Sequence, residues 1–216
     1  MTVTDFAAWR AAKRSSPLRV VVLTFDDGFA DFHEQALPAL AKFGATATLY
    51  VTTGHVGGTS TWLSRIGEGN RRLLSWPQIE ECHRAGIEIG GHSIHHPALD
   101  LLPPAELRKE IFGCKRSIED RLQISARSFA YPFGYVSRRA RATVIEAGFE
   151  SACAVRYAQS GVEDDPFRLS RLIARGDCSA RDLIGLLKAG VGALSDRLRS
   201  GVWRGLRLIP SEVIQR

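Results

Sequence analysis

Short apolar segments alternate with longer amphipathic ones, and no other feature of the chain restricts its fold as much. The apolar segments, which we expect to be strands, are 19–24, 46–52, 87–91, 128–131, 151–155 and, more weakly, 169–175. The amphipathic segments, which we expect to be helices, are 31–43, 76–85, 104–122, 137–147 and 180–189. Strands that alternate with helices predict parallel βα units, as a barrel or as a doubly wound sheet. In either arrangement, ligands bind at the C-terminal ends of the strands.

Local signals support several helix boundaries. A proline pair precedes the helix 104–122, and the sequence SARD at 179–182 has the spacing of a capping box. Helices often end in a left-handed residue, usually glycine. Three glycines follow helical patterns: Gly44, Gly86 and Gly148.

Composition is typical of a soluble globular protein, with 44% hydrophobic and 24% charged residues among 216. The net charge of +6 comes without a clustered basic stripe, so we expect no nucleic-acid partner. Residues 1–17 lack the apolar segment of a secretory signal, and no apolar run is long enough to span a bilayer. We therefore expect a cytoplasmic protein. Four cysteines stand singly and are expected to be reduced: Cys82, Cys114, Cys153 and Cys178.

The length favours one domain, which we place at 19–192 between an N-terminal extension, 1–18, and a tail, 193–216. In the tail, apolar residues such as Leu198 and Trp203 alternate with arginines. A basic amphipathic helix of this kind either packs on the domain or lies on an anionic membrane surface. We favour packing; membrane contact would place the protein at the inner membrane face. The sequence predicts no oligomeric state.

Two adjacent carboxylates, Asp26 and Asp27, end the first apolar segment in VVVLTFDDG. Neighbouring residues of a strand point to opposite faces, so we expect the two side chains to occupy different environments. Taken alone, the sequence Asp-Asp-Gly is as typical of a solvated turn as of a catalytic site.

Three histidines follow the third apolar segment in GGHSIHHP. His92 and His96 are four residues apart, so a helical turn would place both imidazoles on one face, where they could bind one metal ion. Two histidines and one carboxylate leave coordination positions open, as in catalytic metal sites. The alternative is a polar loop of solvated or capping histidines. Three histidines in five residues, at a strand end facing an aspartate pair, favour metal binding. We expect His95 to face away from the metal, as a supporting or surface residue.

The motifs TFDDG, HSIHHP and AYPFG, in this order, resemble those of the polysaccharide deacetylase family, the carbohydrate esterases of family 4 with a NodB homology domain. The resemblance covers residues about 20–175 and is closest to the branch with FAYPFG. It implies an α/β fold, a distorted, incomplete (β/α) barrel. It also implies a metal-dependent hydrolase that removes N-acetyl groups, with O-acetyl groups as the alternative, from a carbohydrate during polysaccharide biosynthesis or modification.

The resemblance also implies roles for individual residues. Asp27, His92 and His96 would hold a divalent cation, first of all Zn²⁺, and Asp26 would be the general base. The backbone N–H of Phe133 would stabilise the oxyanion. The wall of the substrate groove would be formed by Tyr131, Pro132, Phe133 and Gly134.

Two departures from the family pattern leave roles open. Many relatives carry an arginine close before the third-motif proline; here Arg171 is our candidate for the cation that orients the base, with a surface arginine as the alternative. Many relatives also use a C-terminal histidine as general acid, but this chain has no histidine after His96. Of the histidines left, His33 and His83 lie in helical patterns, so His55, in the long loop 53–75, is our candidate. Protonated Asp26 or the metal-bound water could return the proton instead. In the same loop, Trp62 could stack on a sugar.

Two alternatives to a deacetylase remain. The same domain could hydrolyse other C–N bonds, as a deformylase or a cyclic-amide hydrolase. It could also be a catalytically silent glycan-binding module. The complete set of Asp26, Asp27, His92 and His96 argues against a silent module, whereas the missing C-terminal histidine argues for one.

Overall fold

The computed structural model describes residues 1–12, 20–161 and 163–189. The chain divides into two compact units, which we describe separately. The first comprises Met1–Ala154 and Val162–Leu169 and contains the sheet. The second comprises Val155–Gly161 and Ser170–Arg216, and its described part includes the helix α6 (Ala180–Ala189). The predicted tail, 193–216, lies outside the described residues.

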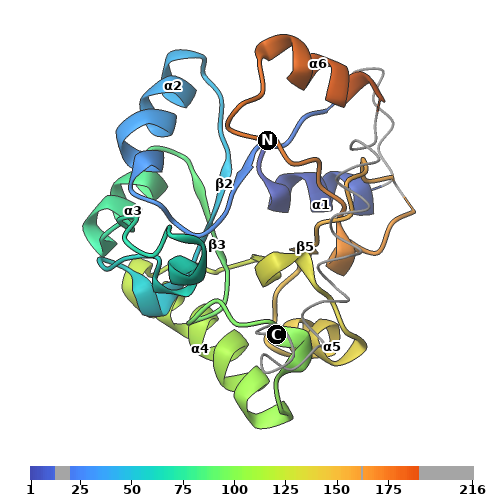
Figure 1. Cartoon of the computed structure of the whole chain (residues 1–216). Coiled ribbons are helices and arrows are strands. Elements are labelled where there is room, and N and C mark those ends of the chain that lie inside the picture. Colours follow the sequence, from blue (N-terminus) through green and yellow to red (C-terminus); the bar gives the residue numbers. More distant parts are fainter. Residues whose placement is uncertain (13–19, 162, 190–216) are drawn as a thin grey trace, which may run out of the picture. The chain divides into compact units, whose positions relative to one another are not determined.

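Five parallel strands form the sheet of the first unit, and they pair in the order in which they occur in the chain. They are β1 (Thr24–Phe25), β2 (Thr48–Val51), β3 (Glu88–Gly91), β4 (Ser128–Ala130) and β5 (Ser151–Cys153). A doubly wound sheet reverses its strand order at a switch point, and this sheet has no such reversal. The sheet instead curls into a half-barrel, so the predicted α/β fold, a distorted and incomplete barrel, is confirmed (Figure 1).

A helix follows each of the first four strands, and Figure 1 shows these helices one after another around the outside of the sheet. They are α2 (Leu37–Lys42), α3 (Trp76–Arg84), α4 (Pro104–Leu122) and α5 (Arg138–Glu146). A π-helix, η1 (Phe32–Ala36), leads into α2. Five short 3₁₀ helices lie in the connections: η2 (Thr53–His55), η3 (Thr61–Ile66), η4 (Leu99–Leu101), η5 (Pro132–Gly134) and η6 (Pro166–Arg168).

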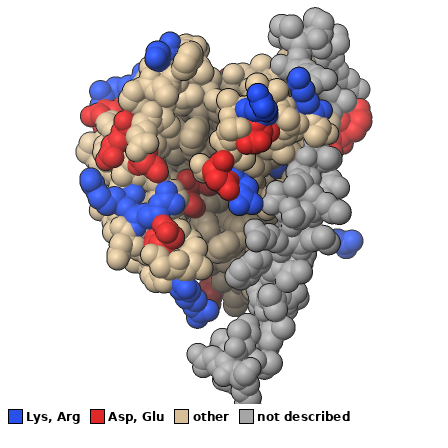
Figure 2. Space-filling model, turned by 45° about the horizontal axis from the view of Figure 1, so that its top comes forward, with Lys and Arg blue, Asp and Glu red and all other residues tan. Residues whose placement is uncertain are grey.

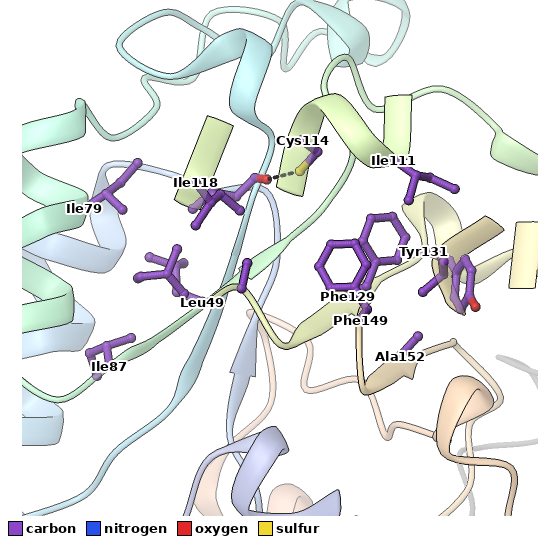
Figure 3. Packing of buried hydrophobic residues seen from close by; sticks show 14 of the residues in the cluster. Leu49, Ile79, Ile87, Ile111, Cys114, Ile118, Phe129, Tyr131, Phe149 and Ala152 are labelled. Atoms are coloured by element: carbon purple, nitrogen blue, oxygen red, sulfur yellow. Dashed lines mark hydrogen bonds between the residues drawn. The ribbon is translucent and has the colours of Figure 1, made fainter. Parts of the chain in front are cut away.

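Side chains on the outer face of the sheet form the main core with α3, α4 and α5. Leu49 and Phe129 from the strands belong to the same cluster as Ile111 and Cys114 from α4 (Figure 3). Because adjacent strand residues point to opposite faces, Tyr50 and Cys153 belong instead to a second cluster on the inner face. The helix α1 (Val3–Ala11) covers that inner face through Val3 and Phe6. The strands β2 to β5 are therefore mostly buried on both faces, whereas both residues of β1 are half-buried.

A carboxylate, Glu88, ties α1 to the N-terminal ends of three strands. It accepts hydrogen bonds from the hydroxyls of Thr48 and Ser128, both at 2.7 Å. It also accepts hydrogen bonds from the backbone N–H of Thr4 at 3.2 Å and from the Thr4 hydroxyl. The backbone N–H of Val3 donates to the Thr48 hydroxyl at 2.9 Å. Glu88 therefore links the inner-face helix to β2, β3 and β4.

Most predicted elements are present, with three corrections. The strands are shorter than predicted, and 169–175 contributes a single bridge, from Leu169 to Cys153, rather than a strand. The helix predicted at 31–43 begins as the π-helix η1. The N-terminal extension contains α1, which we did not predict although Thr2 and Asp5 form a capping box at its start. Among the described residues, no helix combines the length and apolar composition needed to cross a membrane.

Candidate metal centre

The C-terminal ends of β1, β3 and β4 bring the three sequence motifs to one edge of the sheet. Asp26 and Asp27 follow β1, the HSIHH segment follows β3, and the residues 131–134 follow β4. Neighbouring parallel strands end at the same edge, so segments far apart in the sequence become neighbours in space. The predicted grouping of the motifs is confirmed.

Asp26 and Asp27 lie beyond the end of β1, which stops at Phe25. Asp27 has a φ of 73° and Gly28 a φ of 78°, so the chain turns sharply at the second carboxylate. We expected strand alternation to point the two aspartate side chains to opposite faces of the sheet. That expectation is wrong, because both residues lie beyond the end of the strand. A non-glycine residue in the left-handed region costs about 1–3 kcal/mol and is often found at functional sites.

His92 and His96 meet without a helical turn, so the predicted helix geometry is also wrong. Residues 94 and 95 form a bend, and the residues on either side of it have a φ of 66° at Ser93 and 58° at His96. The two imidazole centroids nevertheless lie 4.9 Å apart, and both rings are buried. The spacing was therefore informative, although the backbone that produces the pair is a strained turn and not a helix.

Asp27, His92 and His96 present one ligand atom each, and these three atoms lie within 4.8 Å of one another. Asp27 Oδ1 is 3.3 Å from His92 Nε2 and 3.2 Å from His96 Nε2. Because His92 Nδ1 donates to the carbonyl of Ala130 at 2.7 Å, the neutral ring would turn a lone pair towards the carboxylate. Two lone-pair atoms at this distance need a proton or a cation between them.

Three buried polar atoms at this centre lack hydrogen-bond partners among the described residues: Asp27 Oδ1, His96 Nδ1 and Trp62 Nε1. Such atoms are uncommon in folded proteins and indicate a missing partner. Of the three, Asp27 Oδ1 is the atom that a cation could satisfy, because it lies beside both Nε2 atoms, whereas Trp62 Nε1 is a donor. The hydrogen bond from His92 to Ala130 fixes the tautomer that leaves Nε2 free to bind a metal, as in known metal sites. The residues present therefore fit a divalent cation held by two imidazoles and one carboxylate.

The pKa values at this centre follow from burial and from charge. Burial raises the pKa of Asp27, but the imidazoles of His92 and His96 beside its carboxylate outweigh burial and hold that pKa well below its usual range. Burial lowers the pKa of His92, but Asp27 and Asp26 outweigh it and leave the pKa raised. For His96, burial prevails and its pKa is lowered. Asp27 is therefore ionised, as a metal ligand must be.

Asp26 is half-buried, and its charge acts on both His92 and His96. It therefore lies at the metal centre, where we expected the general base. Phe133 also lies there, with its ring 4.6 Å from the His96 ring. Phe133 has a φ of 58° and a 48% exposed side chain, so it presents an aromatic face to solvent beside the metal ligands.

The expected groove wall needs correction. Tyr131 is 0% exposed, its ring packs on Phe129, and its hydroxyl donates to the carbonyl of Phe167 at 3.1 Å. Pro132 and Gly134 are also buried. Tyr131 is therefore a core residue, and among 131–134 only Phe133 has an exposed side chain.

The long loop 53–75 brings His55 and Trp62 to the metal centre. Trp62 stacks on His96, with ring centroids 5.0 Å apart, and on Phe29 at 6.5 Å. His55 lies against Trp62 at 4.8 Å and edge-on to His95 at 5.9 Å. Burial and the neighbouring His95 lower the pKa of His55. Trp62 therefore lies against the candidate ligand His96 and His55 lies against Trp62, and the roles of both residues stay predictions.

One predicted residue is not placed at the site, and one residue at the site was missed. Arg171 belongs to the second unit, so its proposed role stays a prediction. Glu110 on α4 was missed. It accepts hydrogen bonds from His95 and from the turn before His96. The sequence did contain a signal for it, because a glutamate between Leu107 and Ile111 falls on the apolar stripe of α4.

Figure 2 shows basic side chains interspersed with acidic ones on one face, without a continuous basic stripe among the described residues.

Comparison with known proteins agrees with this geometry. The family model for polysaccharide deacetylase matches residues 13–152, which include all three motifs. The chain belongs to the polysaccharide deacetylase family. The family acts on acetylated polysaccharides.

Several relatives extend this comparison. The Bacillus subtilis protein YxkH is 26% identical over 153 residues, which cover 71% of this chain and 47% of that protein. The poly-β-1,6-N-acetyl-D-glucosamine N-deacetylase of Staphylococcus epidermidis is 23% identical over 187 residues, covering 82% of this chain and 62% of that one. This chain therefore spans about half to three-fifths of their length.

Solved structures share the fold. The Streptococcus pyogenes deacetylase PplD, in complex with acetate, superposes with a TM-score of 0.73 at 22% identity, covering 85% of this chain and 77% of that one. IcaB from Ammonifex degensii superposes with a TM-score of 0.71 at 21% identity, covering 87% and 81%.

Proposed function

We propose that this polysaccharide deacetylase is metal-dependent and hydrolyses N-acetyl groups on a polymer of an amino sugar. One observation carries the proposal: Asp27, His92 and His96 converge within 4.8 Å around a carboxylate oxygen that no described residue satisfies. Two imidazoles and one carboxylate leave open positions, and zinc is the first cation to test. Bound there, such a cation would supply Lewis-acid chemistry to the acetyl carbonyl and to water.

The chain's own residues supply the remaining chemistry. Asp26 lies beside the ligands and takes the proton from the attacking water. The backbone N–H of Phe133, held by its left-handed conformation, stabilises the oxyanion. His55, between Trp62 and His95, is the candidate that returns a proton to the leaving amine. Arg171 remains the candidate for orienting Asp26.

Two lines of support favour an N-acetylated glycan. The exposed aromatic surface of Phe133, beside Trp62 and His96, suits stacking on a sugar ring. The Staphylococcus epidermidis relative is a poly-β-1,6-N-acetyl-D-glucosamine N-deacetylase, so a β-1,6-linked N-acetylglucosamine oligomer is the first substrate to test. We also propose a cytoplasmic location, or one at the inner membrane face, where acetylated glycans are assembled; fractionation of cells would test it.

The test is a release assay with the metal-loaded full chain. Acetate and formate are measured from β-1,6 and β-1,4 N-acetylglucosamine oligomers and from acetylated xylan, each with and without a chelator. The proposal predicts acetate from an N-acetylated oligomer, lost with chelator and restored by metal. Formate release alone would favour a deformylase. Bound metal and bound oligosaccharide without any release would favour a glycan-binding module.

A further inference from the structure

Glu110 is a charged residue on the otherwise apolar stripe that α4 turns towards the sheet. The buried residues of that stripe are Leu107, Glu110, Ile111, Cys114 and Ile118. The Glu110 side chain is only 11% exposed. A buried carboxylate is retained only where it is well hydrogen-bonded, so the partners of Glu110 indicate its role.

All three donors that reach Glu110 belong to the turn at 93–96. One carboxylate oxygen accepts the backbone N–H of Ile94 at 2.9 Å and of His95 at 2.8 Å. The other oxygen accepts from His95 Nδ1 at 2.7 Å. This turn ends at the metal ligand His96, so Glu110 holds the segment that carries a ligand.

The turn has a backbone conformation that needs external support. Both Ser93 and His96 have a positive φ, which few non-glycine residues adopt without compensating contacts. The Ser93 hydroxyl accepts from the N–H of His96 at 3.0 Å. The Ile94 side chain packs against Gly113 of α4 so closely that a Cβ added at Gly113 would lie 2.5 Å from Ile94 Cδ1. The helix α4 therefore contacts the turn at a second point.

The same turn also holds the segment that carries His55. The carbonyl of Ser93 accepts from Thr53 N–H at 3.2 Å, and that of Ile94 accepts from Gly54 N–H at 2.9 Å. A Cβ added at Gly54 would lie 2.7 Å from Ile94 Cγ2, so the two segments pack closely. A shift of the turn would therefore move His96 and η2 together.

We propose that Glu110 is a positioning residue that fixes the turn 93–96 and thereby sets the cation affinity of the site. The inference rests on the proposed metal site. Glu110 acts through main-chain N–H groups and the His95 ring, and it is not itself a ligand. In known metal sites, removing a residue that supports a ligand weakens metal affinity by about 10–100-fold.

The test is a titration of the metal-free full chain with Co²⁺, followed by visible absorption, for Glu110→Ala and Glu110→Gln. The matched control is Glu106→Ala, which removes an exposed carboxylate one turn earlier on α4. We expect Glu110→Ala to raise the Co²⁺ Kd by about 10–100-fold. Glu110→Gln should raise it by about 3–10-fold, because its amide oxygen still accepts both backbone N–H groups. The control should stay within about twofold of the wild type.

Co²⁺ affinities of Glu110→Gln and Glu110→Ala within about twofold of the wild type would overturn the inference. If Glu110→Ala shows no cooperative melting, Glu110→Gln alone decides. If Glu110 had a purely structural role, its variants would have a lower melting temperature and an unchanged Co²⁺ Kd. If it is a positioning residue, its variants have a higher Co²⁺ Kd and an unchanged oligosaccharide KM at saturating metal. Wild type that binds Co²⁺ but releases no acetate would refute the proposed function and leave this inference standing.

Discussion

Replacing Glu88 with alanine should destabilise the first unit, because this carboxylate gathers four hydrogen bonds at the N-terminal ends of the strands. Its donors are the hydroxyls of Thr4, Thr48 and Ser128 and the backbone N–H of Thr4. A hydrogen bond to a charged group contributes about 1.5–3 kcal/mol. The full sum of about 6–12 kcal/mol is an upper limit, because Glu88 also lines an open groove where water can satisfy part of the freed donors.

We therefore expect Glu88→Ala to lower the free energy of unfolding by about 3 kcal/mol, which corresponds to a melting temperature lower by about 6–12 °C. Glu88→Gln keeps the shape and one acceptor oxygen, so we expect a loss of about 1 kcal/mol. Urea unfolding followed by circular dichroism measures both. Glu80→Ala, which removes an exposed carboxylate on α3, is the control and should change stability by less than about 0.5 kcal/mol. A loss below about 1 kcal/mol for Glu88→Ala would refute the reasoning that Glu88 ties α1 to the sheet.

Three further predictions concern the site and its supporting strand. Because burial lowers the pKa of His55, an acid role predicts that kcat falls as pH rises through a pKa below the usual histidine value. His55→Ala should lower kcat and flatten that limb, and an unchanged pH profile would exclude the role. In steady-state kinetics, Trp62→Ala should raise the oligosaccharide KM by about 10-fold and Trp62→Phe by about threefold, because an aromatic contact contributes about 0.5–1.5 kcal/mol. An unchanged KM would exclude stacking of Trp62 on the sugar. Gly90→Ala should lower the free energy of unfolding by about 1–3 kcal/mol in thermal unfolding, because the added Cβ would lie 2.5 Å from Tyr50 Cε1. The control Gly176→Ala adds a Cβ in open space and should leave the free energy of unfolding unchanged.

The order of elements was predictable because its signals are local. The helix α4 has the predicted bounds, Pro104–Leu122, since a proline pair begins it and the apolar period of its inner stripe continues to its end. The capping box at 179–182 is also present, with the backbone N–H of Ser179 bonded to Asp182 at 2.9 Å. The glycines Gly44, Gly86 and Gly148 have positive φ, as predicted.

The candidate metal ligands could be predicted from residue types and motif order, but the geometry that brings them together could not. His92 and His96 meet through a strained turn that depends on Glu110, a residue 14 positions after His96 in the printed sequence. We predicted that Tyr131 lines the substrate groove, and this was wrong because an aromatic residue at a strand end is as typical of the core as of a groove. Its burial depends on packing against Phe129 and on a carbonyl at Phe167. Such contacts between distant segments leave no local pattern in the sequence.

We propose that one cation, held by Asp27, His92 and His96, supports deacetylation. The most direct measurement is a titration of the metal-free full chain with Zn²⁺, in which bound metal and acetate release from an N-acetylglucosamine oligomer are followed together. We predict that both rise in parallel and reach a plateau at one equivalent, and that Asp27→Asn loses both while keeping its fold by circular dichroism. Full acetate release from the metal-free chain, or from Asp27→Asn, would contradict the account.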